Sequence, residues 1–201
     1  MSGARAPGRR ASARRASSAP ATATRRWGSH ELRPGWARRL VAAAAPDPGE
    51  LVLDLGAGRG ALTLPLTERR SRVVAVELHP GRAERLRQRV PPGVTVLEDD
   101  VLGFPLPGRP FRVVSNPPYA VAAALVRRLT APGTALSAAH LVLPRWQVNR
   151  YLARPPRGFT AEVGPHVPAS AFRPPPRHES AVLVLRAVPG RNRRRPRTRR
   201  R

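Results

Sequence analysis

Residues Leu51–Thr63, LVLDLGAGRGALT, begin as an apolar run, pass through three closely spaced glycines and continue into helix-forming residues. This order is typical of a strand, a tight turn and a helix, with a ligand close to the backbone of the turn. The glycines follow a GxGxG spacing, which differs from the GxGxxG spacing of pyrophosphate-binding loops. Asp54 precedes the turn, and its carboxylate would repel a phosphate. We therefore expect a ligand that carries a cationic or amino-acid group and not a dinucleotide.

On both sides of this unit, runs typical of strands alternate with segments typical of helices. We predict helices at residues 32–45, 61–69 (broken near Pro65), 82–89, 121–129 and 146–152, and strands at residues 50–55, 71–78, 93–100, 111–116 and 136–144. Two later runs, residues 159–168 and 180–188, are expected to pair as an antiparallel edge. Alternating strands and helices indicate an α/β fold with a mostly parallel sheet and with ligands at the carboxyl ends of its strands.

Acidic residues stand at the ends of three successive predicted strands. Asp54 belongs to the first of these ends, Glu77 to the second and Asp100 to the third. A carboxylate at the second end can accept hydrogen bonds from both hydroxyls of a ribose. Any one of these acids is commonly a solvated charge, but the ordered set of three predicts a nucleoside pocket.

The third strand end would hold the base of that nucleoside. Asp100 is placed to accept a hydrogen bond from an adenine amino group, while Val101 and Leu102 pack against the ring. Glu98 and Asp99 are neighbouring alternatives to Asp100 in this role, because the register of the strand is not fixed by the sequence.

A stiff turn, Ser115–Tyr119 (SNPPY), follows the fourth predicted strand. Proline biases the residue before it toward extended backbone, so Asn116 and Pro117 are both held away from helical geometry. The side-chain oxygen of Asn116 and the carbonyl of Pro117 then form two fixed acceptors, which match the two hydrogens of an exocyclic amine. Tyr119 can stack on the base that carries this amine. We call Asn116 and Pro117 the amine clamp, and it predicts methyl transfer to an adenine amino nitrogen.

These motifs stand in the order found in ribosomal RNA adenine-N6 methyltransferases, which the sequence resembles over roughly residues 27–188. The resemblance rests on DLGAGRG (54–60), VEL (76–78), DVL (100–102), NPPY (116–119) and VPASAFRPPPRHESAVLVL (167–185). The sequence looks most like the Erm type, which modifies large-subunit (23S) ribosomal RNA and gives resistance to macrolide, lincosamide and streptogramin antibiotics. The sister family of small-subunit dimethyladenosine transferases is the alternative. The motif NPPY also occurs in DNA amino and protein glutamine methyltransferases, so FRPPP followed by ESA is the more specific element.

The resemblance implies a Rossmann-like class I methyltransferase fold, S-adenosyl-L-methionine as the cofactor, and methylation of the exocyclic N6 of an adenine in ribosomal RNA. It implies that Phe172 packs on the flipped target base opposite Tyr119. The catalytic residues are then Asn116, Pro117, Tyr119 and Phe172. The implied cofactor-binding residues are His30, Leu32, Asp54, Gly56, Gly58, Glu77, Leu78, Asp100, Val101 and Asn116. We assign no metal, because the histidines lack the spacing of ligands.

Two departures from the family pattern stand out. The family's Gln-Asn/His-Phe segment, which helps to hold the methionine part of the cofactor, appears here as Ser29-His30-Glu31. Family members usually continue into a helical C-terminal domain, whereas only an arginine-rich tail follows Val188 here. We therefore expect a short form whose RNA binding relies on the catalytic domain and on basic tails.

The composition points to a polyanionic partner. The formal net charge is +25, all 37 basic residues are arginine, and residues 1–26 and 186–201 hold seven and nine of them without any acid. Such charge favours binding to nucleic acid. We expect a disordered basic arm at residues 1–26, a catalytic domain at residues 27–188 and a disordered tail at residues 189–201.

The remaining expectations concern location and rival functions. No apolar run is long enough to span a bilayer, no secretory signal is visible and there is no cysteine, so we expect a cytoplasmic monomer without a membrane partner. A non-catalytic RNA-binding factor on a methyltransferase fold is a second hypothesis. A protein methyltransferase is a third, which the segment Phe172-Arg173-Pro174 disfavours.

Overall fold

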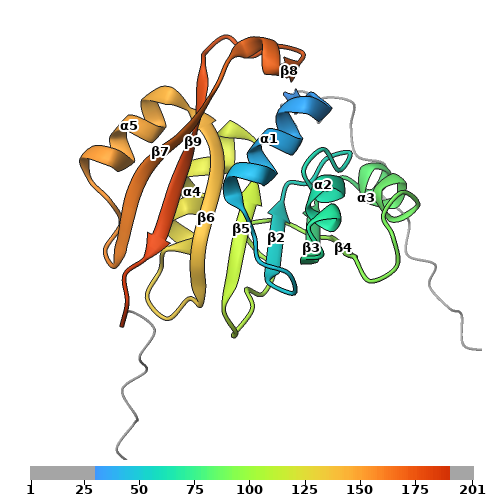
Figure 1. Ribbon diagram of the computed structural model, residues 1–201, viewed down its shortest axis with the longest axis horizontal. Helices are drawn as coiled ribbons and strands as arrows, with labels where there is room; N and C mark the ends of the chain where they lie inside the picture. Colours follow the sequence, from blue (N-terminus) through green and yellow to red (C-terminus); the bar gives the residue numbers. More distant parts are fainter. Residues whose placement is uncertain (1–29, 191–201) are drawn as a thin grey trace, which may run out of the picture.

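The computed structural model of the protein describes residues 30–190. Their main sheet has seven strands in the order β4-β3-β2-β5-β6-β9-β7 (Figure 1). The strands are β2 (Leu51–Leu55), β3 (Arg72–Glu77), β4 (Thr95–Glu98), β5 (Phe111–Ser115), β6 (Leu136–Pro144), β7 (Phe159–Val167) and β9 (Ser180–Ala187). The first five strands in this order, β4, β3, β2, β5 and β6, pair in parallel, whereas β9 runs antiparallel to both β6 and β7. The predicted α/β class is confirmed, and the antiparallel strand lies one place inside the edge.

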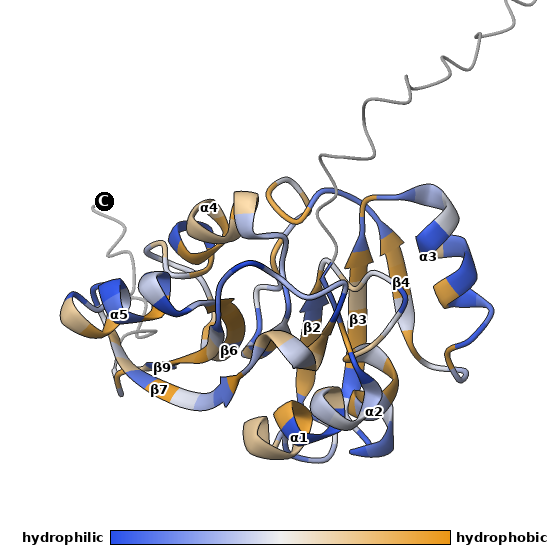
Figure 2. Ribbon diagram, turned by 90° about the horizontal axis from the view of Figure 1, so that it is seen from above, coloured by the Kyte–Doolittle hydropathy of each residue, from blue (hydrophilic) through white to orange (hydrophobic). Residues whose placement is uncertain are grey.

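Helices cover both faces of this sheet. They are α1 (Pro34–Ala44), α2 (Thr63–Glu68), α3 (Pro80–Arg87), α4 (Tyr119–Leu129) and α5 (Arg145–Ala153). Alternation along β2 explains the two layers, because Leu53 belongs to the core that contains Leu125 of α4, whereas Val52 belongs to the core that contains Leu40 of α1. Figure 2 shows the apolar strands between these helical layers.

The helix boundaries correct three of the predictions. Helix α3 spans Pro80–Arg87 and begins two residues earlier than expected. Helix α2 is not broken near Pro65, because this proline is the third residue of the helix, where its missing N–H needs no intrahelical partner. Helix α4 begins at Tyr119, two residues earlier than expected, because Pro118 takes an extended conformation (φ −55°, ψ 130°) and serves as its N-cap. The amine clamp is therefore separated from helix α4 by Pro118 alone.

A two-stranded sheet at the carboxyl end of the main strands was not predicted (Figure 1). Strand β1 (Glu31–Leu32) pairs antiparallel with β8 (Phe172–Arg173), which follows the 3₁₀ turn η2 (Ala169–Ala171). The N–H of Arg33 extends the contact by donating to the carbonyl of Ala171 at 2.8 Å. Two-residue strands carry no periodic pattern, so only the folded structure reveals that these distant segments meet.

The expected basic arm at residues 1–26 lies outside the described residues, as does nearly all of the tail expected at residues 189–201. Among residues 30–190, no helix has both the length and the apolar character needed to cross a membrane.

Arg112 of β5 links the sheet to the end of α1, and this link should be essential for stability. Its Nε donates to both carboxylate oxygens of Glu50 (2.9 and 3.0 Å), and its Nη1 donates to the carbonyl of Ala44 (3.1 Å). The ion pair is largely buried, with side-chain exposures of 12% and 19%. Arg112→Met should therefore lower the free energy of unfolding by about 3 kcal/mol. It leaves the largely buried carboxylate of Glu50 without its cation, with the hydrogen bond from the N–H of Asp47 (3.1 Å) remaining.

Urea unfolding measures this loss. Arg87→Met is the matched control, because it breaks the exposed ion pair with Glu84 on α3 and should cost less than about 1 kcal/mol. Equal losses in the two variants would contradict a structural role of Arg112.

Candidate functional site

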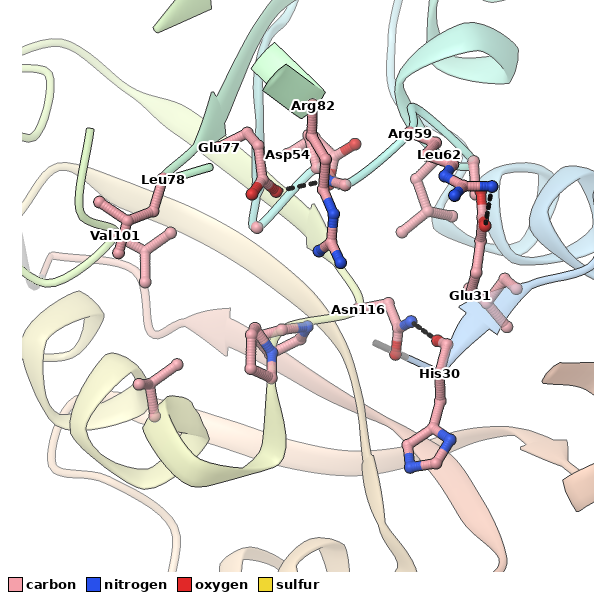
Figure 3. A pocket seen from close by; sticks show the side chains of 18 of the residues that line it. His30, Glu31, Asp54, Arg59, Leu62, Glu77, Leu78, Arg82, Val101 and Asn116 are labelled. Carbon is pink, nitrogen blue, oxygen red and sulfur yellow. Dashed lines mark hydrogen bonds and ion pairs between the residues drawn. The ribbon is translucent and has the colours of Figure 1, made fainter. Parts of the chain in front are cut away.

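A cavity of about 790 Å³ lies at the carboxyl ends of β2, β3 and β5, and we call it the main cavity (Figure 3). The turns after these strands and the small β1–β8 sheet supply its walls. It brings together nearly all of the residues singled out in the sequence: His30, Leu32, Asp54, Gly56, Gly58, Glu77, Leu78, Asp100, Val101, Asn116, Pro117 and Tyr119. Phe172 is not among the residues that line it. Lining residues that were not among the predicted catalytic or cofactor-binding residues include Arg59, Arg82 and Pro174.

The glycine turn after β2 requires glycine at more than one place. Gly56 has φ +80°, and a Cβ there would stand 3.1 Å from Cδ of Pro118 in the amine-clamp turn. Gly60 has φ +88°, and a Cβ there would collide with the side chain of Leu86 on α3. Because both positions are left-handed and crowded, a side chain at either would be strained. Gly56 and Gly58 line the main cavity, where they present bare backbone.

Glu77 fixes this turn. Its side chain is 4% exposed, and its two carboxylate oxygens accept hydrogen bonds from the N–H of Gly58 (2.7 Å) and the N–H of His79 (2.9 Å). Each oxygen keeps a further lone pair, so the carboxylate remains able to accept from a pair of ribose hydroxyls. The sequence indicated the ribose role but gave no sign that the same carboxylate anchors the glycine turn.

Asp54 lies beneath the turn and is only 1% exposed. Its Oδ2 accepts a hydrogen bond from the hydroxyl of Thr63 at 2.6 Å. Burial raises the pKa of Asp54 to about 7, the hydrogen bond from Thr63 opposes this shift, and the charge of Glu77 adds to it. A cationic ligand in the main cavity would favour the ionised form of Asp54.

Of the three acids at the end of β4, only Asp100 lines the main cavity. Strand β4 ends at Glu98, and Asp100 lies in the following turn, where its Oδ1 accepts from the N–H of Leu102 at 2.9 Å. Asp100 lines the cavity, whereas Glu98 and Asp99 do not. Leu78 and Val101 flank the same end of the cavity and give it an apolar surface (Figure 3).

The amine clamp stands across the main cavity from these residues. The amide nitrogen of Asn116 donates to the carbonyl of His30 at 2.8 Å (Figure 3). This bond assigns the orientation of the amide, so that Oδ1 is left as the acceptor for a ligand. The buried hydroxyl of Ser115 donates to the carbonyl of Leu55 at 2.5 Å and so holds the start of the turn against β2.

The aromatic residues differ from the arrangement implied by the family. Phe172 is 1% exposed and lies in the core beside α1, because the β1–β8 pairing turns its ring inward. The imidazole of His30 stands near both rings, with its centroid 5.8 Å from that of Tyr119 and 6.4 Å from that of Phe172. The expected stacking of Phe172 on a base is therefore not available in this conformation, and the ring near Tyr119 is that of the half-buried His30.

Two further bonds hold these aromatic side chains. The hydroxyl of Tyr119 is hydrogen-bonded to that of Ser180 at 2.7 Å, and Nδ1 of His30 lies 2.9 Å from the carbonyl of Pro174. Burial raises the pKa of Tyr119, although the bond with Ser180 lowers it somewhat, so the phenol stays neutral at physiological pH. No cluster of three His, Asp or Glu side chains suited to a metal ion occurs within residues 30–190.

These residues fit S-adenosylmethionine. One end of the main cavity offers apolar side chains and Asp100 for an adenine, and Glu77 stands between that end and the glycine turn for a ribose. The other end offers acidic and basic side chains, Glu31 and Arg59, for a charged amino-acid group (Figure 3). The donor set matches a nucleoside with a zwitterionic tail.

The raised pKa of Asp54 gives a pH-dependent prediction. The unfolded carboxyl ionises near 3.8 and the folded one near 7, so the native state holds an extra proton between these values and loses stability as the pH rises. Asp54→Asn cannot ionise. Between about pH 4 and pH 8 the free energy of unfolding of the wild type should therefore fall by roughly 4 kcal/mol relative to that of Asp54→Asn. Urea unfolding across this range tests the claim. The exposed Asp47→Asn should track the wild type, and a pH-independent difference for Asp54→Asn would contradict the shift.

Comparisons with known sequences agree with this geometry. The sequence model described as "Ribosomal RNA adenine dimethylase" matches residues 29–194. The "Ribosomal RNA small subunit methyltransferase A" of Verminephrobacter eiseniae is 33% identical over 171 residues, covering 73% of this chain and 60% of that protein. The "Probable ribosomal RNA small subunit methyltransferase A" of Pyrobaculum islandicum is 32% identical over 173 residues, covering 80% of this chain and 72% of that protein. The chain thus spans only about 60% of the length of the first of these relatives.

Comparison with solved structures gives related folds. The 23S rRNA methyltransferase ErmE superposes with a TM-score of 0.70 at 27% identity, covering 78% of this chain and 69% of that one. A dimethyladenosine transferase from Plasmodium falciparum has a TM-score of 0.69 at 22% identity, covering 79% and 63%, which shows the fold. The family match, the identity to its members and the arrangement of the main cavity lead to one conclusion: the chain belongs to the ribosomal RNA adenine dimethylase family.

Proposed function

We propose that the protein transfers methyl groups from S-adenosylmethionine to the exocyclic N6 of an adenine in ribosomal RNA. The observation that carries this proposal is the position of the amine clamp. Asn116 and Pro117 line the same cavity as Glu77 and Asp100, and the bond to His30 leaves the side-chain oxygen of Asn116 as an acceptor. A nucleoside-type donor site and an amine-binding turn in one cavity are what this reaction requires.

The clamp would act on the nucleophile. The lone pair of an adenine N6 is delocalised into the ring, so the nitrogen is a poor nucleophile in its planar form. If the oxygens of Asn116 and Pro117 accept its two hydrogens, they hold the amine in an orientation that directs the lone pair at an electrophilic carbon. S-adenosylmethionine, when bound, supplies that carbon as a methyl group on a sulfonium. The nitrogen loses its proton after the bond to carbon forms, so no general base is needed before attack.

The neighbouring side chains would position the base. The phenol of Tyr119, held by Ser180 and kept neutral by burial, offers its ring as a stacking surface. His30 is the nearest aromatic partner in the structure, while Phe172 would contribute only if the β1–β8 segment moved to uncover it. Positioning and fixed dipoles are expected to provide most of the rate enhancement.

Small-subunit ribosomal RNA is the substrate we propose first. The sequence alone favoured the large-subunit RNA of the Erm type, but the curated relatives that match over most of the chain are named as small-subunit methyltransferases. Large-subunit RNA remains a second candidate, because the structure of ErmE superposes well. The antibiotic resistance expected from the sequence depends on this second candidate and has no other support.

A methylation assay separates the candidate functions. The full chain is incubated with methyl-labelled S-adenosylmethionine and, separately, with small-subunit RNA, large-subunit RNA and a protein extract. We expect one adenine of the small-subunit RNA to be labelled, as mapped by primer extension. Label only in large-subunit RNA would support the second candidate, and label only in protein would refute RNA methylation. Cofactor binding without any transfer would support a non-catalytic RNA-binding factor.

Asn116→Ala tests the amine clamp. The variant removes one of the two fixed acceptors, and we expect the turnover number to fall by about 10²- to 10³-fold. Binding of S-adenosylhomocysteine, measured by calorimetry, should change by less than about threefold, because Glu77 and Asp100 remain in place. Asn149→Ala, on the exposed side of α5, is the matched control and should retain full turnover. Loss of cofactor binding in Asn116→Ala would contradict the division of roles.

A further inference from the structure

Two oppositely charged side chains face each other at one end of the main cavity. Nη1 of Arg59 lies 4.0 Å from Oε2 of Glu31, and both residues line the cavity. Figure 3 shows this pair on the opposite side of the cavity from Leu78 and Val101, with Glu77 and Asp54 between the two ends. A nucleoside whose base lies against Leu78 and Val101 would therefore extend its tail toward Glu31 and Arg59.

The backbones that carry these side chains are fixed by other contacts. Arg59 belongs to the glycine turn, and its carbonyl accepts a hydrogen bond from Nη1 of Arg89 at 2.8 Å. Glu31 belongs to β1, where it pairs with Arg173 of β8. Both charged groups are thus held at the cavity by rigid segments, while the side chains themselves can reorient.

The ion pair is weak in the form seen here. A separation of 4.0 Å is at the outer limit of an ion pair, and the side chains of Arg59 and Glu31 are 62% and 38% exposed. Exposed ion pairs of this kind contribute little to stability. Exchanging this contact for contacts with a ligand therefore costs little.

We propose that Glu31 and Arg59 together bind the amino-acid end of S-adenosylmethionine. The guanidinium of Arg59 takes the carboxylate of the ligand, and the carboxylate of Glu31 takes its ammonium group. A zwitterion inserted between the two side chains replaces one long ion pair with two shorter, charge-assisted contacts. The inference rests on the methyl donor of the proposed function and is independent of its RNA substrate.

The two charged side chains come from distant parts of the sequence. Among the described residues, Arg59 is the basic residue that forms an ion pair with Glu31. The two residues are 28 positions apart along the chain and meet only because β1 lies over the glycine turn.

A nearby ion pair offers a matched control. Arg38 and Glu68 lie 3.9 Å apart with exposures of 65% and 59%, so this pair resembles the first in distance and solvation. Both of its residues line a smaller adjoining cavity of about 310 Å³, but neither lines the main cavity. Changes at Arg38 or Glu68 should therefore not affect a ligand in the main cavity.

Calorimetry with two ligands tests the proposal on the full chain. S-adenosylhomocysteine carries the amino-acid group, whereas 5′-methylthioadenosine keeps the adenosine and the thioether but lacks that group. We expect Glu31→Gln and Arg59→Gln each to weaken binding of S-adenosylhomocysteine by about tenfold, the loss of one partly exposed charge-assisted contact. Binding of 5′-methylthioadenosine should stay within about twofold of the wild type, which also shows that the variants are folded.

Arg38→Gln and Glu68→Gln are the control variants, and they should leave the affinities for both ligands unchanged. An equal weakening of both ligands, or an unchanged affinity for S-adenosylhomocysteine in Glu31→Gln and Arg59→Gln, would overturn the proposal. Failure of the proposed RNA substrate would look different. The wild type would then leave small-subunit RNA unlabelled, but it would still bind S-adenosylhomocysteine and 5′-methylthioadenosine with different affinities.

Discussion

The parallel pairing of β2 with β3 on one side and β5 on the other is the constraint on which the rest of the site depends. Leu55 is in register with Val76, and Leu53 with Val113, so these strands end together at one edge of the sheet. The glycine turn, the carboxylate of Glu77 and the amine clamp all follow these ends directly. None of them would face the others if one strand slipped by a single residue, because such a slip reverses the side on which each side chain points.

Local patterns predicted those parts of the site that a single βα unit creates. The glycine turn, Glu77 and Asn116 were found because each directly follows an apolar run, and the run itself indicates where the strand ends. The burial of Phe172 could not be predicted, because it depends on which face of a two-residue strand meets the core. The ion pair of Glu31 with Arg59 was missed for a similar reason, since neither residue has a regular neighbour whose periodicity would orient it.

The main cavity combines buried, fixed carboxyl groups with more exposed charged groups at one end. Burial raises the pKa of Asp54 to about 7, and Glu77 accepts hydrogen bonds from backbone N–H groups on both of its oxygens. Glu31 and Arg59, by contrast, are partly exposed and weakly paired. Rigid, desolvated groups suit the nucleoside part of a ligand, because no reorganisation is needed when it binds. Side chains that can reorient suit a flexible tail.

The contact between β1 and β8 also sets the order in which the site can be assembled. Glu31 lies opposite Arg173, and the ring of His30 contacts the carbonyl of Pro174, so one wall joins residues from the two ends of the described chain. During synthesis the first of these segments leaves the ribosome long before the second exists. The early strands can pair while the wall is still missing, and closure of such a distant contact is entropically slow. The wall of the cavity can therefore close only after residues 172–174 have been translated.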